Sequence, residues 1–102
     1  MTYRVRFTLE ASDDLERLYE FIVSRDDSDV SLAERALAAI ASGIATLESS
    51  PFTCRKARLD APLLRELVIP FGSSGYVALF EVEDAQTVTV LAVRHQREDD
   101  YY

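Results

Sequence analysis

Cationic side chains form two short groups in this chain, and their chemistry sets the first expectation about function. The first group is Arg55, Lys56, Arg58 and Arg65, and the second is Arg94 and Arg97. Between residues 52 and 65 the four cations are accompanied by a single acid, Asp60. Salt screens charges over roughly 8 Å in a cell, so such an island can hold a phosphate group although acidic residues lie elsewhere. We take these six residues, together with His95, as candidate target-binding residues.

Groups that could transfer a proton are much scarcer than the cations. Arginine stays protonated and is therefore a poor base, and the chain contains one lysine and one histidine. His95 is the plausible base because imidazole titrates near neutral pH, and Tyr101 or Tyr102 is a conceivable acid or stacking surface. The sequence thus supplies groups that bind anions and few that catalyse, so no single catalytic residue is expected.

Counts of other residue types exclude several kinds of site. The single cysteine, Cys54, cannot form an internal disulfide or a thiolate zinc cluster, and it fits a reducing compartment. One histidine excludes a histidine-rich metal site, and three glycines leave no G-x-x-x-x-G-K phosphate cradle. At 102 residues the chain is one domain, residues 1–102, with no room for a cofactor domain. We expect neither a cofactor nor a bound metal.

The net charge and the first residues of the chain limit which partners and which cellular location are expected. Acidic residues outnumber basic ones by 18 to 11, which gives a net charge of −7. Such a surface is not drawn to nucleic acid or to an anionic membrane in general, so neither strong nucleic-acid binding nor membrane association is expected. The first seven residues alternate polar and apolar side chains, unlike a signal peptide or a membrane span. The expected location is the cytoplasm.

Apolar periodicity predicts the elements that must position these residues. Residues 2–9 alternate like a strand, and two helical patterns follow. After a basic connection, three more strands separated by four-residue turns indicate an antiparallel meander. The helices are expected over 11–25 and 31–48, and the strands over 64–71, 76–82 and 87–94. The prediction is a single α+β domain of order β-α-α-β-β-β, with a helical hairpin packed on a mainly antiparallel four-stranded sheet.

Strand alternation assigns a face to each residue near the end of the last strand. Successive side chains point to opposite faces, so His95 shares a face with Thr87 and Thr89 while Arg94 lies on the other. Threonine is typical of a solvated face. His95 is therefore predicted to be better placed for a reaction than Arg94.

Five stretches of the chain together resemble the RelE/ParE superfamily of toxin–antitoxin toxins. They are residues 11–22 (ASDDLERLYEFI), 47–51 (LESSP), 64–67 (LREL), 75–80 (GYVALF) and 90–98 (VLAVRHQRE). Their order and spacing are similar to the superfamily over essentially the whole chain. The helix with Asp14-Leu15 and the last of the five stretches look more like the ParE branch.

The resemblance implies a small bacterial toxin that is silenced by an antitoxin, whose extended C-terminal segment wraps it. The ParE branch poisons DNA gyrase, and the RelE branch cuts messenger RNA on the ribosome. Three features depart from the usual pattern of these toxins. Phe52 follows Pro51 where a glycine is common, Phe80-Glu81 replaces a Tyr-Arg pair, and the chain is acidic where such toxins are usually basic.

Three functions remain open at this point. The preferred one is a non-enzymatic toxin that binds DNA gyrase and traps it on cleaved DNA, with the sheet, the basic connection and the C-terminal segment as contact surfaces. The second is a ribosome-dependent mRNA endoribonuclease whose catalytic residues are Arg65, Arg94, His95 and Tyr101. The third is an inactive homologue that only binds its antitoxin, which Glu81 and the acidic surface suggest. In each case the expected partner is a cognate antitoxin in a hetero-oligomer, covering apolar positions of the sheet and the hairpin.

Overall fold

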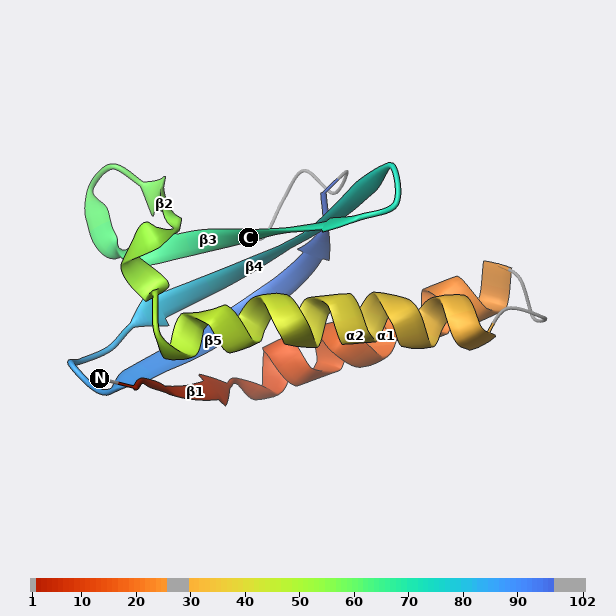
Figure 1. The fold of residues 1–102 in the computed structure, drawn as a ribbon, viewed down its shortest axis with the longest axis horizontal. Helices are drawn as coiled ribbons and strands as arrows, with labels where there is room; N and C mark the ends of the chain where they lie inside the picture. Colours follow the sequence, from red (N-terminus) through yellow and green to blue (C-terminus); the bar gives the residue numbers. More distant parts are fainter. Residues whose placement is uncertain (1, 26–29, 97–102) are drawn as a thin grey trace.

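Two helices lie on one face of a five-stranded sheet in the computed structural model, which describes residues 2–25 and 30–96 (Figure 1). The strands are β1 (Arg4–Phe7), β2 (Arg55–Arg58), β3 (Ala61–Phe71), β4 (Ser74–Val82) and β5 (Thr87–His95). The helices are α1 (Leu9–Arg25) and α2 (Val30–Ala45), and two 3₁₀ turns, η1 (Thr46–Glu48) and η2 (Pro51–Thr53), follow α2.

The sheet has the order β1-β5-β4-β3-β2. Strands β2 to β5 pair antiparallel with their neighbours, whereas β1 pairs parallel with the first half of β5, from Arg4 opposite Thr87 to Phe7 opposite Val90. The apolar strand 76–80 is therefore central, as its two apolar faces predict. The order leaves β2 and β1 at opposite edges, so the cations of β2 stand at a free sheet edge.

The junction between β1 and α1 depends on Thr8. Its backbone amide continues the pairing with β5 by donating to the carbonyl of Val90 at 3.0 Å. Its hydroxyl oxygen accepts the amide of Ala11 at 3.0 Å, which satisfies one of the unpaired donors at the start of a helix. The helix therefore begins two residues earlier than its apolar periodicity indicates, and it leaves directly from the end of β1.

The core lies between the helices and the sheet. Its largest fully buried side chains include Phe80 of β4, Ile40 of α2 and Leu47 of η1. α2 comes close to β3 at Gly43, where an added Cβ would stand 2.8 Å from the Cγ1 of Ile69. The run Val30–Glu48 is long and apolar enough to cross a membrane by composition. Ala36, Ile40, Ile44 and Leu47 of this run belong to the core between the helices and the sheet.

One expectation about the sheet is wrong. The basic stretch after α2, interpreted from the sequence as a connection, contains β2, so the sheet has five strands rather than four. Its residues Arg55–Arg58 carry no apolar alternation because β2 is an exposed edge strand, and edge strands need only backbone pairing. The β3–β4 turn is also tighter than four residues, since Phe71 pairs with Ser74 and Gly72 adopts a φ of +61°.

The face of the sheet opposite the helices is also largely covered. Val77 and Leu79 of β4 point away from the helical core, and each is 6% exposed. From the sequence, the cover of this face is expected to be the C-terminal tail, a partner or a partly open groove. The tail, residues 97–102, lies outside the described residues.

Candidate functional site

The cations of β2 project from the free edge of the sheet. Arg55 and Arg58 expose 61% and 57% of their side chains, and Lys56 is exposed between them. Arg55 pairs with Glu66 at 3.0 Å, and both ends of the Arg58 guanidinium contact Asp60 at 3.0 and 3.1 Å. Surface ion pairs of this kind contribute little to stability and exchange partners easily. These three cations are therefore accessible to an anionic surface of another molecule.

Arg65 has a different role from its neighbours on β2, although the sequence groups it with them. Its guanidinium donates to the carbonyl oxygens of Pro62, Phe52 and Cys54, at 3.0, 3.2 and 2.8 Å. It also lies over the Phe52 ring, 4.9 Å from the centroid. Arg65 therefore fastens η2 and the start of β2 to β3. Burial raises the pKa of the neighbouring Cys54 thiol, which the charge of Arg65 opposes in part.

Arg94 is tied to the fold by a buried carboxylate, Asp14 of α1. Asp14 is 4% exposed, and its Oδ1 lies 2.5 Å from Nη1 of Arg94. Its Oδ2 accepts the backbone amide of Val93 at 3.0 Å, at the edge of β5 beyond the end of β1. Arg17 also contacts Asp14. Asp14 thus links α1 to the end of β5 through the side chain of Arg94 and the backbone amide of Val93.

The electrostatics of this cluster favour the charged form of Asp14. Burial alone would raise its pKa, but the hydrogen bond from Arg94, the Val93 amide and the charges of Arg94 and Arg17 hold the pKa below its ordinary value. A buried carboxylate with these partners stays ionised at neutral pH. Asp14 therefore acts as a fixed counter-ion for Arg94, whose side chain is only 20% exposed.

His95 lies at the end of β5 among groups of β4. Its Nε2 lies 3.1 Å from the Ser74 hydroxyl, and its ring meets the edge of Tyr76 with centroids 5.5 Å apart. Tyr76 is itself a core residue, and burial raises its pKa, which keeps the phenol protonated. The imidazole therefore has a hydroxyl group and an aromatic ring of β4 among its neighbours.

The predicted face of His95 requires a correction. Leu79 pairs with Ala92 whereas the next residue, Phe80, pairs with Val90, so a β-bulge at residue 91 interrupts the alternation of β5. Beyond the bulge the faces exchange, and His95 shares the helix-facing side with Val93 rather than the side of the threonines. Those threonines, at positions 87 and 89, are only 7% and 5% exposed, so the face interpreted as solvated is covered.

The candidates for ribonuclease chemistry do not meet in the described part of the chain. Arg65 stands opposite Phe80 and His95 opposite Tyr76, four residues apart along β4, which corresponds to roughly 13 Å. Arg94 turns to Asp14. Arg97 and Tyr101, predicted as a target contact and as a possible acid, lie outside the described residues, as does Tyr102.

Two other features were not predicted from the sequence. Asp14 is one of them, and only its position on the helix side that carries Leu18 could have marked it as buried. A groove between α1 and α2 is the second feature. It has a volume of about 530 Å³ and is lined by Phe7, Ser12, Leu15, Glu16, Tyr19, Leu37, Ile40, Ala41 and Ile44.

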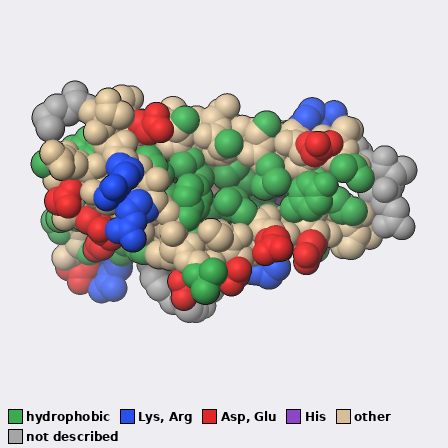
Figure 2. Space-filling view, turned by 90° about the horizontal axis from the view of Figure 1, so that it is seen from below, with side chains coloured by type: hydrophobic (Ala, Val, Ile, Leu, Met, Phe, Trp, Pro, Cys, Tyr) green, Lys and Arg blue, Asp and Glu red, His purple; other side chains and the backbone are tan. Residues whose placement is uncertain are grey.

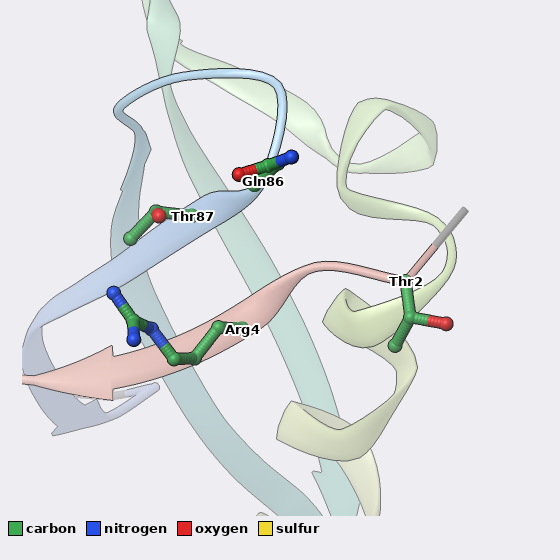
Figure 3. A pocket seen from close by; sticks show the side chains of 4 residues that line it. All are labelled: Thr2, Arg4, Gln86 and Thr87. Carbon is green, nitrogen blue, oxygen red and sulfur yellow. The ribbon is translucent and has the colours of Figure 1, made fainter.

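A second hollow, at the start of β1, has a polar lining of Thr2, Arg4, Gln86 and Thr87 (Figure 3). Its backbone is held by the amide of Arg4, which donates to the carbonyl of Gln86 at 2.7 Å. One cation and three neutral side chains contain no nucleophile paired with a base. Among residues 2–25 and 30–96, no three histidine, cysteine, aspartate or glutamate side chains are placed to hold a metal ion.

Comparison with known proteins agrees with this architecture. The family model described as the ParE toxin of the type II toxin–antitoxin system, parDE, matches residues 5–100. No curated protein matches the chain in sequence.

Two solved structures show a similar fold. The chromosomal ParDE toxin–antitoxin system of P. aeruginosa is similar with a TM-score of 0.73 and 18% identity, covering 92% of this chain and 96% of that chain. The toxin–antitoxin complex RelBE2 of Mycobacterium tuberculosis is similar with a TM-score of 0.59 and 26% identity, covering 94% of this chain and 100% of that chain.

Proposed function

The chain belongs to the family of ParE toxins of type II toxin–antitoxin systems, and from this premise we propose that it inhibits DNA gyrase by binding to it. The observation that carries the proposal is the contrast between accessible cations and dispersed proton-transfer groups. Three cations stand on the free edge formed by β2, whereas Arg65, Arg94 and His95 are separated and each contacts the protein's own atoms. A toxin that acts by binding needs accessible cations and does not need proton-transfer groups.

The edge formed by β2 is the target-binding surface in this proposal. Acidic side chains or DNA phosphates in a gyrase–DNA complex would replace Glu66 and Asp60 as the partners of Arg55 and Arg58. The Arg58–Asp60 pair is exposed on both sides, and such a pair is worth about 1 kcal/mol or less, so a partner offering two or more aligned anionic groups can displace it. Lys56 makes no salt bridge within residues 2–25 and 30–96, so its ammonium group adds a third contact without losing one.

The arrangement gives less support to mRNA cleavage. Cutting RNA through its 2′-hydroxyl requires a base, an acid and cations around one phosphate, within hydrogen-bond reach of the reacting atoms. The backbone positions of His95 and Arg65 are offset by roughly 13 Å along the sheet. Arg65 itself donates to three backbone carbonyls, so its release would loosen β2.

The second part of the proposal is neutralisation by a cognate antitoxin that covers the groove between α1 and α2. An apolar surface of this kind, left in water, favours a protein partner. The exposed apolar residues near β1 and α1 include Phe7 and Leu9, at 40% and 74% exposure. An antitoxin bound there would extend the apolar burial without occupying the edge formed by β2.

Expression in bacteria under an inducible promoter tests the proposed target. The wild-type chain is expected to cause filamentation and to induce DNA repair, and a chain with Arg55, Lys56 and Arg58 replaced by alanine is expected to lose both effects at equal abundance. Co-expression of the product of the adjacent gene is expected to restore growth. Cleavage of translated codons without DNA damage would support the endoribonuclease instead, and normal growth with antitoxin binding would support an inactive homologue.

A further inference from the structure

The groove between α1 and α2 has the geometry of a helical layer that lacks one helix. Along α1 its lining falls at positions 12, 15, 16 and 19, and along α2 at positions 37, 40, 41 and 44. Both sets follow the i, i+3, i+4, i+7 spacing of a helix-packing face. Figure 2 shows the resulting band of apolar side chains running along the molecule between the two helices. A third helix is the element that such a pair of faces accommodates.

The solvent side of α1 places a row of carboxylates along one border of this groove. Asp13, Glu16 and Glu20 recur at a spacing of three and four residues, so they lie on one side of the helix, and Glu16 itself lines the groove. All three residues are exposed. Arg17, the cation within this segment, turns away to Asp14 and does not neutralise the row. The α1 border is therefore negatively charged.

The α2 border is formed mainly by small side chains, with one exposed cation, Arg35, beside Glu34 near its start. It consists of small exposed side chains at Ala38, Ala41 and Ala45, with Glu34 one turn before the first of them. Alanine allows two helix backbones to approach closely. Figure 2 shows acidic side chains on both sides of the apolar band. A helix in the groove would pack tightly against α2 while its flanks faced carboxylates.

We propose that the groove selects an amphipathic helix of the antitoxin whose apolar stripe is flanked by lysine or arginine. This inference rests on the proposed antitoxin and specifies its chemistry. The carboxylates stay near water, so they contribute mainly to partner choice and association rate, while the apolar lining supplies most of the affinity. The lining spans eight residues of each helix, about 11 Å, so a helix of two turns or more fills it. An acidic helix of the same apolar pattern is rejected by like charge.

The probe for the test is the purified product of the adjacent gene, titrated against this chain by calorimetry. The Glu16→Lys, Glu20→Lys double variant is expected to weaken binding by about tenfold or more, and to reduce the dependence of binding on salt. Glu81→Lys, a charge reversal at an exposed position of β4, outside the two helices that form the groove, is the control and should change binding less than about twofold. Ala41→Trp fills the groove from an exposed position and is expected to abolish binding while the fold, checked by circular dichroism, is retained.

Each outcome has a distinct meaning. If the wild-type chain does not bind the product of the adjacent gene, the antitoxin assignment fails and the inference fails with it. If the wild type binds and both groove variants bind equally well, the antitoxin assignment stands and the proposed groove site is overturned. A dimer of the free chain that Ala41→Trp converts to a monomer in sedimentation would show that a second copy occupies the groove, which also overturns the proposal.

Discussion

The edge formed by β2 and the end of β5 both present cations, yet they hold them in opposite ways. At β5, Arg94 is 20% exposed and is fixed by Asp14, which also takes the amide of Val93. At β2, Arg55 and Arg58 are 61% and 57% exposed. The Asp14 side chain is 6% exposed, whereas Asp60, the partner of Arg58, is 70% exposed and Glu66, the partner of Arg55, is 16% exposed.

The partner of a cation, more than its place in the sequence, decides whether the cation can bind another molecule. A buried pair costs several kcal/mol to break, so Arg94 stabilises the domain and is held from other contacts. An exposed pair costs little to break, so the cations of β2 can bind another molecule. Arg65 lies beside β2 but, like Arg94, it stabilises the domain, because its N–H groups donate to backbone carbonyls.

Removal of the Asp14 carboxylate gives the largest expected effect. Asp14→Ala removes the buried carboxylate that pairs with the guanidinium of Arg94 and accepts the amide of Val93, and we expect a loss of about 3 kcal/mol in the free energy of unfolding. Urea denaturation measures it. Asp13→Ala, at the neighbouring exposed aspartate, is the control and should cost less than about 0.5 kcal/mol. Equal losses in both variants would remove the distinction between the two regions.

The stability of the domain at acidic pH should also depend on the Asp14 carboxylate. Despite its burial, Asp14 has a pKa below its ordinary value of 3.8 because of Arg94, the Val93 amide and Arg17. The unfolded chain therefore binds this proton more readily than the folded chain, so its contribution is complete above pH 3.8 and is lost as pH falls through the folded pKa. Urea midpoints measured between about pH 5 and pH 2 should fall less steeply for Asp14→Asn than for the wild type. Parallel curves would contradict this account.

Replacement of Arg65 should have an intermediate effect. Arg65→Ala removes three hydrogen bonds to backbone carbonyls and the contact with Phe52, and we expect a loss of about 1–2 kcal/mol. Hydrogen exchange should rise first in β2. Arg65→Lys is expected to restore little, because an ammonium group does not reproduce the planar set of donors. Full rescue by lysine would show that charge alone matters at this position.

Replacement of the three β2 cations should have the smallest effect on stability. The triple alanine variant of Arg55, Lys56 and Arg58 should unfold within about 1 kcal/mol of the wild type, because its pairs are exposed. Differential scanning calorimetry measures this. A larger loss would place these residues with Arg94 as parts of the fold, and the proposed division between the two regions would fail.

Much of the fold follows from apolar pattern. The helical hairpin and the meander of β3, β4 and β5 are confirmed, because each buries a periodic apolar face. β2 was missed because an edge strand of charged residues has no such pattern, and its pairing with β3 is a backbone property. The bulge at residue 91 was missed for a related reason. Every residue from 88 to 93 is apolar or threonine, so no change of alternation marks the insertion.

The candidate site was less predictable than the fold. The cations were identified by type, but whether each is free to bind a target depends on contacts between distant segments. Asp14 and Val93 are 79 residues apart, and Arg65 contacts Phe52 across 13 residues. The groove needs two helices aligned side by side, which neither helix indicates alone. Charge and period can be read from a sequence, whereas the partner of each charge cannot.

The most direct test of the account uses purified DNA gyrase, supercoiled plasmid and the purified chain, with cleaved DNA trapped in the gyrase complex quantified on gels. The wild type and His95→Gln are predicted to trap cleaved DNA equally. The triple alanine variant of β2 is predicted to require at least about tenfold more protein, a difference of about 1.4 kcal/mol in binding. No effect of the wild-type chain on gyrase, together with cleavage of translated mRNA that His95→Gln abolishes, would contradict the claim that this toxin acts by binding.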